Sequence, residues 1–155
     1  MVDNSEEVGS GKPEAENKHP LNILLVEDEV TIVPLIERVL KGHNVTSFAS
    51  AEEALDALRK GALFDWVITD RGLAGKMDGF GLADAIKSKR FGNPFVTMLT
   101  GSAATIQKES SPDQLREKGI HQLMGKPFNT QELKGSVNTV RDFMKHSQNP
   151  QAQRI

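Results

Sequence analysis

The sequence predicts an α/β fold, a doubly wound five-stranded parallel sheet with helices on both faces. Short, almost continuously apolar segments alternate with segments of helical periodicity, which is typical of buried parallel strands and their crossover helices. The 155 residues suffice for one ordinary domain. The chain contains no cysteine, which excludes a disulfide framework and a thiolate zinc site.

The first predicted strand reads Asn-Ile-Leu-Leu-Val and is almost wholly apolar. The five predicted strands span residues 22–26, 44–48, 65–69, 95–99 and 120–124. Right-handed crossover connections between such strands place helices on both faces of the sheet. The ligand site of such a sheet lies beyond the carboxyl ends of its strands, where the strand order reverses.

Helical periodicity follows each strand. The predicted helices span 30–41, 51–60 and 80–89, one starts at Ser111, and the last starts at Asn129 or Thr130. Pro34 fits only the first turn of its helix, because proline has no N–H to donate. Ser50-Ala51-Glu52-Glu53 fits a capping box, and Ser111-Pro112 supplies a cap followed by proline at the first helical position. We expect residues 102–111 to form a long polar loop.

The two ends of the chain are polar. We expect a disordered tail over residues 1–20, one folded domain over 21–145 and a second polar tail over 146–155. The net charge is −2 and no basic stripe appears, so direct nucleic-acid binding is not expected. No apolar run approaches the roughly 20 residues that span a bilayer, and no signal sequence is visible. We therefore expect a cytoplasmic protein without membrane association.

Polar residues follow four of the five predicted strands, at the edge where a ligand site is expected. They are Glu27, Asp28 and Glu29 after the first, Asp70 after the third, Thr100 and Gly101 after the fourth, and Lys126 after the fifth. Each residue alone is a weak signal, since acids at a helix start favour the helix dipole and a lone lysine is usually surface charge. Their joint position at one sheet edge favours a functional site.

Clustered carboxylates repel one another, and a hard divalent cation removes that repulsion. We expect Mg²⁺ (or Mn²⁺) with Asp28 and Asp70 as direct ligands and Glu27 acting through water. The Asp70 carboxylate is then a nucleophile toward phosphorus. Lys126 and the Thr100 hydroxyl, with the adjoining Gly101, are the predicted contacts to the phosphate oxygens.

The ordered set Glu27-Asp28, Asp70, Thr100 and Lys126-Pro127-Phe128 resembles the receiver domain of bacterial two-component response regulators. The resemblance covers residues 21–145 and implies a flavodoxin-like receiver fold with Asp70 as phosphoacceptor. It also implies that the backbone carbonyl of Gly72 completes the metal shell. The implied phosphodonor is the phosphohistidine of a sensor histidine kinase or histidine phosphotransfer protein. Such a domain catalyses only its own phosphorylation and dephosphorylation, and is not a turnover enzyme.

Three departures from that family are visible. Leu123 stands where the family often has an aromatic residue that turns inward on activation. The loop after Asp70 keeps Met77-Asp78-Gly79 but lacks the usual proline and is one residue longer, and the loop over residues 102–111 is longer by several. Gly72 and Ser102, which would flank the acyl phosphate, are both small, and this predicts rapid loss of the phosphoryl group.

Three functions remain open from the sequence. The first is a phosphorylatable receiver that signals by conformational change to a separate output protein, since only ten residues follow Lys145. The second is a receiver-like interaction module that works without phosphorylation, which the departure at Leu123 keeps open. The third is a phosphohydrolase, but these enzymes usually need a second carboxylate two residues after the nucleophile, where Gly72 stands.

Overall fold

The structure is a computed structural model and describes residues 19–147. Five parallel strands form one sheet in the order β3-β2-β4-β5-β6. The strands are β2 (Asn22–Val26), β3 (Asn44–Phe48), β4 (Trp66–Asp70), β5 (Phe95–Thr100) and β6 (Gln122–Gly125). The predicted fold class is confirmed. The strand order reverses between β2 and β4, and the crevice at their carboxyl ends is the expected ligand position.

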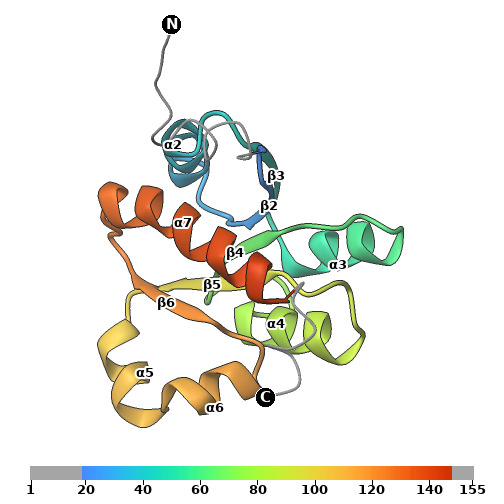
Figure 1. Cartoon of the computed structure of the whole chain (residues 1–155). Helices are drawn as coiled ribbons and strands as arrows, with labels where there is room; N and C mark the ends of the chain where they lie inside the picture. Colours follow the sequence, from blue (N-terminus) through green and yellow to red (C-terminus); the bar gives the residue numbers. More distant parts are fainter. Residues whose placement is uncertain (1–18, 148–155) are drawn as a thin grey trace, which may run out of the picture.

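Six helices of the described residues cover the sheet (Figure 1). They are α2 (Ile32–Val39), α3 (Ala51–Arg59), α4 (Gly79–Ser88), α5 (Ala103–Glu109), α6 (Pro112–Glu117) and α7 (Thr130–Ser147). Two core clusters lie on the two faces of the sheet. One contains buried residues of α3 to α6, and the other contains buried residues of α2 and α7. Successive strand residues divide between the clusters, since Leu24 belongs to the first and Leu25 to the second.

The largest error of the sequence prediction concerns residues 102–111, which were expected as a loop. Residues 103–109 form helix α5, whose Ile106 is 7% exposed and belongs to the core cluster on that face. One buried apolar residue in seven leaves no helical period in the sequence. Thus the hydrophobic pattern did not reveal this helix, and burial of Ile106 joins it to the core.

Helix ends follow the expected capping chemistry with small changes. Ser111 and Gln114 form a reciprocal capping box, and the Asn129 side chain accepts from the N–H groups of Gln131 and Glu132. The Ser50 hydroxyl accepts from the N–H of Glu53, but the Glu53 carboxylate accepts from Ala49 instead of completing the box at Ser50.

The last helix is longer than the sequence suggested. α7 continues through His146 and Ser147, where a polar tail was expected. The Asn93 amide donates to the Ser147 hydroxyl at 3.2 Å, and Phe143 packs edge-on against Phe95, so the final turn is held to the sheet. Most of the two predicted tails (1–20 and 146–155), namely residues 1–18 and 148–155, lies outside the described residues.

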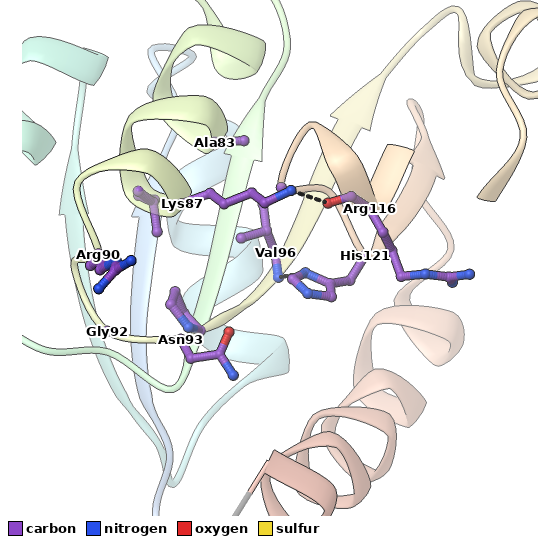
Figure 2. Close-up of a pocket in the computed structure, with 11 residues that line it drawn as sticks. Ala83, Lys87, Arg90, Gly92, Asn93, Val96, Arg116 and His121 are labelled. Carbon is purple, nitrogen blue, oxygen red and sulfur yellow. Dashed lines mark hydrogen bonds between the residues drawn. The ribbon is translucent and has the colours of Figure 1, made fainter. Parts of the chain in front are cut away.

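A pocket of about 160 Å³ lies at the amino ends of β5 and β6, opposite the polar edge (Figure 2). There the Lys87 ammonium donates to the backbone carbonyls of Arg116 and Glu117 at 3.4 and 2.6 Å. An added Cβ on Gly119 would lie 2.7 Å from the carbonyl oxygen of Ala83. The end of α6 is thus held closely against α4.

Candidate functional site

Three carboxylates from two neighbouring strands meet at the switch point. Glu27 and Asp28 follow β2, and Asp70 is the last residue of β4, so the parallel pairing of these strands places all three at one edge. One carboxylate oxygen from each residue lies within 4.8 Å of the others. Glu27 and Asp70 are buried, at 2% and 7% exposure, whereas Asp28 is more exposed.

The Lys126 ammonium, just beyond β6, faces the same cluster. Its Nζ lies 3.3 Å from Oδ2 of Asp70, 3.3 Å from Oε1 of Glu27 and 2.9 Å from Oε1 of Glu29. Partial burial lowers the pKa of Lys126, but the hydrogen bond to Glu29 and the charges of Glu27 and Asp70 outweigh that burial. The net result is a pKa above the ordinary value, so the ammonium stays charged.

The pKa of Glu27 is also raised, which is the opposite of what an ion pair alone produces. Burial of the carboxylate is the largest cause, and the charge of Asp70 acts in the same direction. The N–H of Glu29, which donates to Glu27 at 3.1 Å, and the Lys126 ammonium only partly offset these effects. A single ammonium shared by several carboxylates leaves the cluster short of positive charge.

Glu29 is the contact that sequence reasoning missed. It was noted as the third acid of the run after the first strand but received no role, and it makes the shortest of the three contacts to Lys126. The run of three acids was the available signal. Whether its third member turns toward a residue 97 positions away depends on the tertiary fold.

Thr100 ends β5 beside the cluster. Leu99 pairs with Asp70 in the sheet, so Thr100 lies one residue further along. The residue is buried. Its hydroxyl accepts from the N–H of Ser102 at 3.1 Å, and its carbonyl oxygen accepts from the N–H of Lys126 at 3.0 Å. The second contact ties the positions of Thr100 and Lys126 together.

The remaining predicted residues are not members of this carboxylate cluster. Gly72 and Gly101 are exposed, and an added Cβ on either would meet no atom within 4 Å. Leu123 is half-buried, pairs with Met98 in the sheet and lines a pocket between α5, α6 and β6. The structure therefore brings Glu27, Asp28, Asp70 and Lys126 into one cluster with Thr100 at its border, while Leu123 lies outside it.

Comparisons with known proteins agree with this geometry. The profile of the family described as "Response regulator receiver domain" matches residues 23–138. The transcriptional regulatory protein YvrH of Bacillus subtilis is 30% identical over 119 residues, which are 75% of this chain but only 47% of that protein. The chain thus spans about half the length of this relative.

Two solved structures show the same fold. A putative response regulator from Chloroflexus aurantiacus is 31% identical with a TM-score of 0.65, over 78% of this chain and 97% of that one. The chemotaxis response regulator CheY4 of Vibrio cholerae is 27% identical with a TM-score of 0.64, over 78% of this chain and 98% of that one. Within residues 19–147, no helix is both long and apolar enough to cross a membrane. Because the receiver-domain profile matches residues 23–138, the chain belongs to the response regulator receiver domain family of two-component signalling proteins.

Proposed function

We propose that Asp70 accepts a phosphoryl group from the phosphohistidine of a sensor histidine kinase or histidine phosphotransfer protein, in a Mg²⁺-dependent reaction. One observation carries the proposal: the Lys126 ammonium lies 3.3 Å from the Asp70 carboxylate, inside a cluster that also holds Glu27 and Asp28. A nucleophilic carboxylate beside a fixed cation suits phosphoryl transfer, in which catalysis consists of positioning and charge neutralisation.

The donor set fits a hard divalent cation. Its members are oxygens, and their negative charge exceeds what one ammonium balances. Burial raises the pKa of Glu27, and the nearby charge of Asp70 raises it further. Asp28, Asp70 and the backbone carbonyl of Gly72 would hold the ion directly, and Glu27 would act through water. When bound, Mg²⁺ (or Mn²⁺) supplies positive charge that offsets the oxygens of the transferring phosphoryl group.

In the transfer step an oxygen of the Asp70 carboxylate forms a bond to phosphorus. The phosphorus–nitrogen bond of the donor breaks, and the imidazole nitrogen keeps the electron pair. Lys126 donates hydrogen bonds to one phosphoryl oxygen, and the Thr100 hydroxyl donates to another after leaving the N–H of Ser102. Hydrolysis of the acyl phosphate restores the carboxylate, so the domain is a phosphorylated switch and not a turnover enzyme.

Signalling follows from the position of Thr100. Its hydroxyl accepts from Ser102, which immediately precedes helix α5. Withdrawal of that hydroxyl toward the phosphoryl group removes a contact that holds the start of α5. The phosphorylated state thereby favours a different arrangement of this surface, which a separate output protein reads.

The test is intact-mass measurement after incubation with acetyl phosphate and Mg²⁺. The wild type should gain one phosphoryl group, Asp70→Asn should gain none, and chelation of Mg²⁺ should abolish the gain. Asp56→Asn is the matched control, because Asp56 is an exposed acid of α3 whose ion pair is with Lys60. If the wild type gains no phosphoryl group, an interaction module that works without phosphorylation is favoured. If Asp70→Asn gains as much as the wild type, the phosphoacceptor is a residue other than Asp70.

A further inference from the structure

The loop between β4 and α4, residues 71–78, is held by a carboxylate from a different part of the chain. Oε2 of Glu52, in the first turn of α3, accepts from the N–H groups of Lys76 and Met77 at 3.0 Å each. A second carboxylate, Oδ2 of Asp28, accepts from the N–H of Ala74 at 3.1 Å. Three backbone N–H groups of this loop are thus bound by two acids.

The loop backbone approaches Glu52 closely between these contacts. Gly75 has φ +101°, a conformation that L side chains rarely adopt, and an added Cβ there would lie 2.8 Å from Oε1 of Glu52. At the other end of the loop, an added Cβ on Gly79 would lie 2.4 Å from the carbonyl oxygen of Asp70. Glycine at position 75 therefore allows the loop to wrap around the Glu52 carboxylate.

Glu52 is free for this contact because its neighbour performs the local capping interactions. Glu53, rather than Glu52, exchanges hydrogen bonds with the Ser50 region at the start of α3. The pKa of Glu52 lies below its ordinary value, mainly because its own N–H and that of Met77 stabilise the charged form. The side chain is exposed and charged at neutral pH, yet it contacts a segment 24 residues further along the chain.

The two acids differ in what a bound cation does to them. Asp28 is a proposed metal ligand, so its oxygens are shared between the cation and the N–H of Ala74. Glu52 is not a member of the carboxylate cluster, so a cation bound there would not compete for the oxygen that accepts from Lys76 and Met77. Glu52 is therefore the contact that can hold the loop independently of the metal.

We propose that Glu52 is a positioning residue for the metal centre: by fixing residues 76 and 77 it keeps the backbone carbonyl of Gly72 beside Asp70. The proposal rests on the proposed function, in which that carbonyl completes the metal shell. A ligand on a loop contributes to affinity in proportion to the fraction of molecules in which the loop is in place. Loss of the Glu52 contacts lowers that fraction and weakens Mg²⁺ binding.

Calorimetric titration of the full chain with Mg²⁺ tests this role. Glu52→Ala should raise the dissociation constant about tenfold, the lower end of the effect of outer-shell partners on metal affinity. Glu52→Gln should bind nearly as well as the wild type, because one amide oxygen can accept from both N–H groups. Asp56→Ala is the matched control, since it removes an exposed acid of the same helix that pairs with Lys60.

A second readout separates positioning from a general structural defect. In Glu52→Ala the Mg²⁺ concentration that half-saturates labelling by acetyl phosphate should rise, while the rate at saturating Mg²⁺ stays within about twofold of the wild type. A merely damaged fold would lower the rate at saturation as well, and that result would overturn the proposal.

Other outcomes are also decisive. Equal Mg²⁺ affinity in Glu52→Ala and wild type overturns the role of Glu52 and leaves the proposed function intact. Binding in Glu52→Gln as weak as in Glu52→Ala assigns the effect to charge and overturns positioning. A wild type that neither binds Mg²⁺ nor is labelled overturns the proposed function and, with it, this inference.

Discussion

The charge balance of the acidic cluster predicts that Asp70→Asn stabilises the protein when divalent cations are absent. Asp70 has two carboxylate neighbours, Glu27 and Asp28, within 4.8 Å and one ammonium, Lys126, at 3.3 Å. At an effective dielectric constant of about 20, each repulsion amounts to roughly 3.5 kcal/mol and the attraction to about 5 kcal/mol. Removing the charge therefore relieves more repulsion than it loses attraction.

These charges alone would raise the free energy of unfolding of Asp70→Asn by about 2 kcal/mol, and solvent screening at the more exposed Asp28 reduces this increase to about 1–2 kcal/mol. In urea unfolding in EDTA at low salt, Asp70→Asn should therefore have a higher midpoint than the wild type. Asp56→Asn, which removes an exposed acid, should change the free energy of unfolding by less than about 0.5 kcal/mol.

Two further conditions sharpen this test. Saturating Mg²⁺ should stabilise the wild type more than Asp70→Asn, because only the wild type retains the full set of carboxylates. Lys126→Met should act in the opposite direction and cost about 3–5 kcal/mol, since it leaves buried acids without their cation. An Asp70→Asn protein that is less stable than the wild type in EDTA would refute the reasoning about the cluster.

Three other predictions concern separate parts of the molecule. Burial lowers the pKa of His121 to about 4, so the unfolded chain binds its proton more tightly. The contribution of neutral His121 to the free energy of unfolding is therefore complete above about pH 6.5 and falls by about 1–3 kcal/mol as the pH drops toward 4. In urea unfolding measured across this pH range, the free energy of unfolding of His121→Gln should depend less steeply on pH than that of the wild type. Arg90 has φ 58° at the end of α4, so Arg90→Gly should raise the free energy of unfolding by about 1 kcal/mol; an unchanged urea midpoint would contradict that. Gly72 and Ser102 would give the proposed acyl phosphate on Asp70 little shielding, so its loss in Mg²⁺, followed by mass spectrometry, should be rapid, and a lifetime of many hours would refute this.

Much of the site was predictable because it lies at strand ends. A parallel strand that is buried on both faces reads as an apolar run, and the first polar residue after it is at the carboxyl edge. Asp70 and Thr100 were located in this way, and the structure shortens or extends their strands by single residues only. The order of these residues along the chain was enough to indicate the family.

Contacts between distant side chains were not predictable by the same reasoning. Glu29 and Glu52 both read as ordinary acids near a helix start, a position that the helix dipole favours. Their actual partners are Lys126 and the backbone of residues 76 and 77. No local pattern distinguishes an acid that faces solvent from one that reaches across to another element.

The sequence by itself determined the five strands, the parallel sheet and the edge at which Asp28, Asp70, Thr100 and Lys126 lie. Local hydrophobic patterns indicate which segments are buried strands, and the residues that follow those strands lie at the carboxyl edge of a parallel sheet. Only the tertiary structure showed that Ile106 packs helix α5 against the core and that Lys126 contacts three acids. These features depend on the packing of elements that are far apart along the chain, and the free energy of that packing has no signature within any single segment.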